Sequence, residues 1–258
     1  YGCKSLQEIV IPSSVISIDD DTFSGCSSLK NISLPSSLKS LQNNVFYGWI
    51  SLQEIIIPSS VISIGDKLFA GCSSLHKISI PSSISSLGKN IFSDIQSIEL
   101  IENIDYIHDY LFYQCDSLCH IILPQSVLTI GSYAFYGCSS LTEIEFNESL
   151  ELIKKFAFYG CSSIIKISIP ETVTIIEDYA FEKCTLLKEI KFPSSLEEIG
   201  TESFKECKSI EIVSLPSCLE FVGDNAFEGC TSLIKIQLPS SIDIDYLGFP
   251  HGIEVQLI

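Results

Sequence analysis

The stretch that decides the fold of this chain lies at residues 115–135 and reads CDSLCHIILPQSVLTIGSYAF. Side chains alternate between apolar and exposed positions around Ile121–Leu123, which is typical of a short half-buried strand. Pro124 ends that strand, because proline has no N–H to donate to a strand ladder. A second apolar pair, a bend at Gly131 and then Phe135 complete the pattern. The stretch therefore predicts a strand, a turn, a second short apolar segment and a bend.

This pattern recurs along the whole chain with a period of about 23 residues, within the range of known repeat units. Phe stands three residues before a Cys slot, Leu or Ile stands three after it, Ile or Val six after it, and Pro nine after it in most units. Trp49 and Ile95 take the Cys slot in two units, and the unit at 95–114 is three residues short. About eleven such units predict a single repeat solenoid, mainly β, over residues 1–258. The slot holds Cys3, Cys26, Cys72, Cys115, Cys138, Cys161, Cys184, Cys207 and Cys230.

Stacking is what buries the recurring apolar residues, because no unit of this size can bury them alone. Neighbouring strands pair at about 4.8 Å, so like side chains form ladders of Ile, Phe and Cys along the solenoid. The cysteines of the slot are expected to point inward as free thiols, since a buried thiol behaves as a small apolar group. Cys119 and Cys218 fall outside the slot and are expected to be the most reactive thiols.

The repeat resembles that of the BspA-like, or Treponema-type, leucine-rich repeat family. The resemblance rests on Cys-x-x-Leu-x-x-Ile-x-Ile/Leu-Pro-x-x-Val/Leu-x-x-Ile-Gly-x-x-Ala-Phe, which is nearly intact at residues 115–135 and 161–181 and covers essentially the whole chain. It implies a leucine-rich-repeat right-handed superhelix with a concave parallel sheet of about eleven short strands. Many members sit on the surfaces of bacteria or protozoan parasites and are similar to adhesins. The resemblance carries over no catalytic residues.

Two segments depart from the repeat. The short unit at 95–114 lacks the Pro-Ser-Ser turn, which is interpreted either as a tolerated deletion that alters curvature or as a hinge or binding notch. Residues 240–258 read as a closing segment that ends in one last strand at 253–258. The chain begins in mid-repeat without Met, so it is expected to be a fragment of a longer protein. An uncovered apolar end would favour end-to-end association of copies.

Composition argues against several classes of function. The net charge is −17, and all fifteen basic residues are Lys, which disfavours nucleic acids and anionic membranes as partners. The acidic balance is interpreted as a solubilising surface, with a basic partner as the alternative. No apolar run is long enough to span a membrane, and no phosphate-binding, dinucleotide or zinc-protease motif occurs. The cluster of Cys115, Cys119 and His120 does not match a zinc pattern, so no metal, cofactor or enzymatic activity is expected.

The candidate binding surface is the concave face, where residues four, five and seven after the Cys slot are expected to be exposed. The five-after row includes Leu100, whereas Ile101, six after the slot, is expected to be buried. This face carries a small basic spot, and exposed isoleucines recur along it. The alternative interpretation is an ordinary solvated surface, because strand propensity alone favours isoleucine. The candidate partner-binding residues are Ile56, His76, His120, Ile122, Glu143, Glu145, Lys166, Lys188, Lys191 and Ile212.

Two functional hypotheses follow. The first is a non-catalytic, adhesin-like protein-binding module at the cell surface or in secreted form, which rests mainly on the family resemblance. The second is an intracellular scaffold or regulatory subunit in the cytoplasm, motivated by the reduced-looking thiol ladder and by the absence of a visible signal peptide. In both cases the expected partner is a protein.

Overall fold

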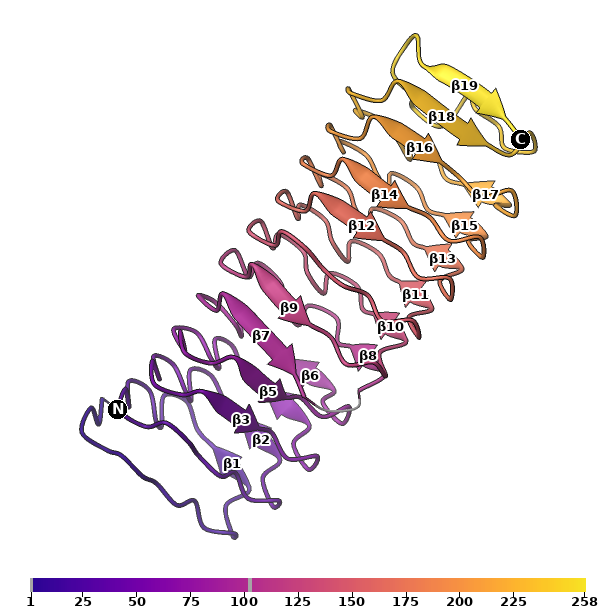
Figure 1. Ribbon diagram of the computed structural model, residues 1–258. Helices are drawn as coiled ribbons and strands as arrows, with labels where there is room; N and C mark the ends of the chain where they lie inside the picture. Colours follow the sequence, from indigo (N-terminus) through magenta and orange to yellow (C-terminus); the bar gives the residue numbers. More distant parts are fainter. Residues whose placement is uncertain (1, 102–103) are drawn as a thin grey trace.

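A computed structural model describes residues 2–101 and 104–258 as a parallel β-solenoid, without a helix in that part of the chain. Strands line two sides of the coils (Figure 1). The long-strand face holds β3 (Glu54–Ile56), β5 (Lys77–Ser79), β7 (Ser97–Leu100), β9 (His120–Ile122), β12 (Lys166–Ser168), β14 (Glu189–Lys191), β16 (Ile212–Ser214), β18 (Lys235–Leu238) and β19 (Glu254–Leu257). The short-strand face holds β1 (Ser17–Ile18), β2 (Ser40–Leu41), β4 (Ser63–Ile64), β6 (Ser86–Leu87), β8 (Tyr106–Ile107), β10 (Thr129–Ile130), β11 (Leu152–Ile153), β13 (Ile175–Ile176), β15 (Glu198–Ile199) and β17 (Phe221–Val222).

Strand pairing follows the sequence period. Lys166 lies opposite Glu189 in the β12–β14 pair, one repeat further along the chain, and similar registers recur on both faces. The long-strand face is made of three separate ladders, β3-β5-β7-β9, β12-β14 and β16-β18-β19, rather than one continuous sheet. Residues 141–147 form no strand, and the first two coils are joined on this face by the single bridge between Val10 and Ser33. β19 closes the solenoid where the sequence predicts a last strand.

A spine of phenylalanines runs through the core. Consecutive rings from Phe46 to Phe227 stack with centroids 5.1–5.7 Å apart, and all are buried. Beside this spine six slot thiols donate to the main-chain carbonyl of the Phe one coil earlier, as Cys161 Sγ does to Phe135 O at 3.1 Å. Trp49, which takes the place of Cys, donates its indole Nε1 to Phe23 O at 2.6 Å and so makes the same bond.

All eleven cysteines are free in the structure, but not every slot cysteine is buried. Cys3 contacts Cys26 in the slot, as its position in the repeat predicts, but it is exposed in the first coil. Cys119 and Cys218 are exposed as predicted. The ladder of buried thiols therefore runs from Cys26 onward.

The short unit corrects the predicted pattern of exposure. Leu100 is 4% exposed and Ile101 is 39% exposed, the reverse of the expectation. β7 pairs with β5 through Leu100 opposite Ile78, and with β9 through Ile98 opposite Ile121, so the register slides by two residues across this one strand. A slip of two preserves which face each side chain points to, and Ile98 and Leu100 both stay in the core. Glu102 and Asn103 lie outside the described residues.

Candidate protein-binding face

Oppositely charged residues on neighbouring strands of the long-strand face form ion pairs. Lys77 and Glu99 are 3.3 Å apart, and Lys166 and Glu189 are 2.7 Å apart. Further along the face, Lys235 pairs with Glu254 at 2.7 Å. These groups largely neutralise one another, and because they are exposed each pair contributes little to stability. The predicted basic spot is therefore smaller than the sequence suggested, since Lys166 is occupied by Glu189.

A patch of apolar and unpaired basic side chains occupies the C-terminal part of this face. Ile165, Ile212 and Ile234 are each more than half exposed. Lys188 lies beside Ile165, to whose carbonyl it donates its main-chain N–H at 2.8 Å. Among the described residues no ion pair is formed by the ammonium of Lys188 or of Lys191. We call these five residues the C-terminal patch.

A groove of about 320 Å³ borders the C-terminal patch at Lys191. It lies over residues 144–148, where the strand ladder is interrupted, and Glu145, Ser168 and Lys191 follow one another across it. On its rim the Glu171 carboxylate accepts bonds from Ser194 N and Oγ at 2.9 and 2.8 Å, and these bonds hold the pKa of Glu171 below its usual value. The groove thus presents fixed negative charge beside a free ammonium.

The remaining predicted residues do not join this patch. Ile56 and Ile122 are exposed on separate coils of the N-terminal ladder, and a hollow of about 400 Å³ borders Ile56. His76 has Nδ1 3.0 Å from Ser74 O, and His120 has Nδ1 3.8 Å from Glu143 Oε1. The structure therefore separates the candidate residues into an N-terminal group and a C-terminal group.

Sequence reasoning overlooked a second surface, on the turns between the two strand faces. Tyr110, Tyr133, Phe156 and Tyr179 stack with centroids 4.4–4.9 Å apart, and all four have positive φ values of 57–64°. Bulky residues rarely adopt this backbone conformation. The signal was present in the sequence as aromatic residues recurring five residues before the Cys slot.

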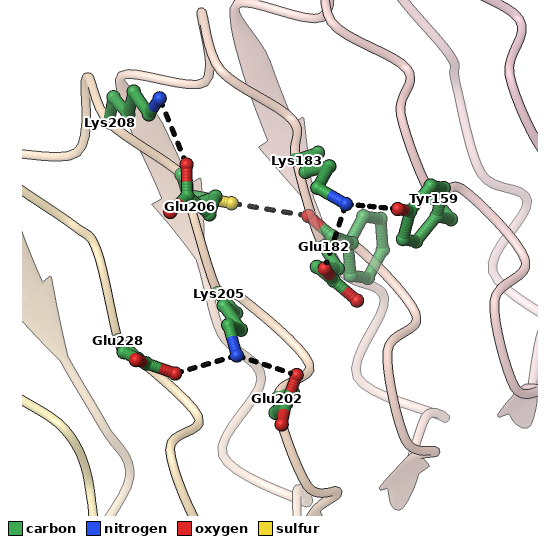
Figure 2. A network of polar contacts seen from close by, with 10 residues as sticks. Tyr159, Glu182, Lys183, Glu202, Lys205, Glu206, Lys208 and Glu228 are labelled. Carbon is green, nitrogen blue, oxygen red and sulfur yellow. Dashed lines mark hydrogen bonds and ion pairs between the residues drawn. The ribbon is translucent and has the colours of Figure 1, made fainter.

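The aromatic surface ends in a network of charges. A parallel column of tyrosines ends at Tyr159, over whose ring the Lys183 ammonium lies 4.6 Å from the centroid (Figure 2). On the next coils Lys205 bridges Glu228 at 2.7 Å and Glu202 at 3.0 Å, and these two carboxylates raise the pKa of Lys205. The network links the stacked turns of neighbouring coils at the surface.

Residues with metal-binding or catalytic potential are not brought together. Cys115 is buried, Cys119 is exposed with Sγ 3.4 Å from Ser117 O, and His120 lies beside Glu143. Within residues 2–101 and 104–258, no group of three His, Cys, Asp or Glu side chains could hold a metal ion. The same residues include no helix that is long and apolar enough to cross a membrane.

The family model for the BspA type leucine-rich repeat region matches residues 1–115 and 151–249 in six copies. The chain belongs to this family. The BspA-type fold agrees with solved structures. A leucine-rich repeat protein from Bacteroides ovatus is 26% identical, with a TM-score of 0.50, and the match covers 100% of this chain and 85% of that one.

A second leucine-rich repeat protein, from Eubacterium ventriosum, is 20% identical to this BspA-type chain, with a TM-score of 0.53 over 90% of this chain and 72% of the other. At that identity the likeness concerns the fold alone. No curated protein matches the chain.

Proposed function

We propose that this chain is a protein-binding module whose partner docks on the C-terminal patch of the long-strand face. The observation that carries the proposal is the grouping of three exposed isoleucines around two unpaired lysines. Elsewhere on the face Lys77, Lys166 and Lys235 are each paired with a glutamate.

The chemistry of the patch favours a partner with an apolar anchor and acidic residues beside it. Ile165, Ile212 and Ile234 are already partly buried, so covering one of them stabilises a complex by roughly half of the 1.5–3 kcal/mol that a fully exposed isoleucine gives. The unpaired ammonium groups of Lys188 and Lys191 lose no partner when they meet a carboxylate, and they steer an acidic surface during encounter. β12, β14 and β16 each pair with one neighbouring strand, and this pairing holds Lys191 and Ile212 in register.

Partner capture with matched variants tests the proposal. The tagged chain is used to capture proteins from the native cell, and the captured proteins are quantified for wild type, Ile212→Glu, Lys188→Glu and Ile62→Glu. Ile62 is equally an exposed isoleucine, but it lies beside β4 on the short-strand face. We expect a partner that is reduced at least tenfold by Ile212→Glu and Lys188→Glu and unchanged by Ile62→Glu. Equal capture by all four proteins would refute the assignment of the patch.

We further propose that the module acts at the cell surface or in secreted form, which rests on the surface location of many BspA-like members. The alternative, an intracellular scaffold, is favoured by the ladder of buried free thiols. Staining of intact and permeabilised cells that express the tagged full-length protein separates the two. Signal on intact cells supports the surface proposal, whereas signal only after permeabilisation supports the scaffold.

A further inference from the structure

One step of the solenoid lacks the main-chain hydrogen bonds that join the coils elsewhere. On the turn side, residues 67–71 donate to residues 89–93 through three N–H groups, and residues 110–114 donate in the same way to residues 132–136. Between these two steps lie residues 90–94 and 110–114, and within the described chain no main-chain hydrogen bond connects them. This absence has no parallel in the steps that follow it, up to residue 247.

The short-strand face is interrupted at the same step. β6 ends one ladder and β8 begins the next, and no pairing joins them in the part of the chain that the structure describes. The ladder of side chains at the bend also stops here. Asp66 accepts from Lys89 N at 2.8 Å, and Asp109 accepts from Ser132 N at 2.7 Å, while Lys89 has no carboxylate to offer the next coil. We call the boundary between residues 84–94 and 104–114 the seam.

Among the described residues, main-chain bonds cross the seam on the long-strand face alone. β5, β7 and β9 belong to one ladder, and Glu99 N donates to His76 O at 2.8 Å (Figure 1). In the core Phe92 and Phe112 still stack at 5.1 Å, but their rings are inclined by 25°, whereas the other pairs of the spine are inclined by 3–11°. The seam is thus bonded along one side and free along two.

Side chains at the seam are poorly satisfied. A hollow of about 250 Å³ lies between Ser85 and Leu87 on one side and Tyr106 to Tyr110 on the other. His108 lines it, and its Nε2 is buried without a hydrogen-bond partner among the described residues. Burial lowers the pKa of His108, although the carbonyl of Pro81 and the carboxylates of Asp109 and Asp105 act in the opposite direction. A buried Nε2 without a partner costs free energy.

We infer that the solenoid is built from two cooperative parts, residues 2–94 and 104–258, hinged along the β5-β7-β9 strands and able to open at the seam. In a repeat protein cooperativity passes between neighbouring coils, so a step with fewer main-chain hydrogen bonds couples the units on either side more weakly. A hinge absorbs motion in a few residues while the packed parts move as bodies. The two-residue shift of strand register lies within β7 alone, so we place the hinge at this strand.

Hydrogen exchange with matched variants tests the separation into two parts. Phe69→Leu and Phe158→Leu each remove one buried ring of the spine, on opposite sides of the seam. We expect Phe158→Leu to accelerate amide exchange at least tenfold across the intact steps of residues 120–236 and to leave residues 40–87 unchanged. Phe69→Leu is expected to do the reverse. If amide exchange is accelerated equally on both sides of the seam by either variant, the inference is overturned.

A repair variant tests the cause. Insertion of Pro-Ser-Ser after Ile101 returns the short unit to the full repeat length and offers the missing turn. We expect the effect of Phe158→Leu to cross the seam once this insertion is present. A boundary that stays in place in a folded insertion variant would contradict the link between the short unit and the hinge.

Distances between spin labels test the opening itself, with the exposed Cys3, Cys119 and Cys218 replaced by Ser. Labels at Tyr47 and Tyr136 span four coils across the seam, and labels at Tyr113 and Lys205 span four coils within one part. Both pairs sit two residues before the Cys slot. We expect a distribution at least twice as broad for the first pair. Equal widths would overturn the hinge.

Discussion

At the scale of single residues, the Cys slot is explained by a hydrogen bond as much as by size. Six of the buried thiols lie beside the Phe spine and donate a second bond to a carbonyl that already accepts a main-chain N–H, as Cys230 does to Phe204 O at 3.2 Å. Trp49 makes the same bond with its indole, whereas Ile95 has no donor to offer. Cysteine recurs because it is the small apolar side chain that still donates.

The buried thiols predict a loss of stability at alkaline pH. Burial raises the pKa of Cys72 and of Cys230 from 9.0 to about 12. Above pH 9 the unfolded chain loses these protons while the folded chain keeps them, so the free energy of unfolding falls as the pH rises from 9 towards 12. Each such thiol contributes about 1.4 kcal/mol per pH unit in that window.

Urea unfolding between pH 8 and 11 measures this effect. We expect Cys72→Ala to show a shallower decline than wild type by about that slope, although it is less stable at pH 8 because of the cavity it leaves. Cys119→Ala, which removes an exposed thiol, is the control and should follow the wild-type slope. An unchanged slope in Cys72→Ala would argue against a desolvated thiol.

At the scale of elements, the close approach of consecutive coils explains why glycine follows the short strand. A Cβ at Gly131 would lie 2.5 Å from Ile107 O and 2.8 Å from Asp109 N, which belong to the coil below. Main-chain atoms cannot yield as a flexible side chain does. The backbone of this coil is therefore packed for a residue without a side chain.

We predict that Gly131→Ala destabilises the protein by about 1–3 kcal/mol, the usual cost of overpacking. Lys154 stands at the equivalent position of the next unit and already has a Cβ, so Lys154→Ala should cost less than about 1 kcal/mol. Thermal unfolding of both variants checks the difference. A larger loss for Lys154→Ala than for Gly131→Ala would contradict the packing argument.

At the scale of the whole molecule, the charge balance opposes the compact state. Thirty-two acidic groups face fifteen lysines, and the ion pairs described on the long-strand face use only a few of the acids. The excess carboxylates repel one another across the exposed surface, and salt screens that repulsion over about 10 Å at 0.1 M.

We predict that raising NaCl from 20 to 200 mM stabilises the chain by about 1 kcal/mol, which corresponds to about 2–4 °C in Tm for a protein of this size. Calorimetry at pH 7 measures the shift, and sucrose of equal osmolality is the control for effects other than screening. A fall in Tm with salt would mean that attractive ion pairs outweigh the repulsion.

The sequence by itself determined the solenoid, its period and most of its inward-facing residues, because each slot requires a particular side chain and the requirement returns in every unit. It also indicated which rows are exposed, since strand residues alternate between faces. Only the tertiary structure decided the pairing of Lys77 with Glu99, the burial of Leu100 and the position of the seam. These features depend on the register of the short unit against both of its neighbours. That register is set by packing between coils, which the sequence of one unit does not specify.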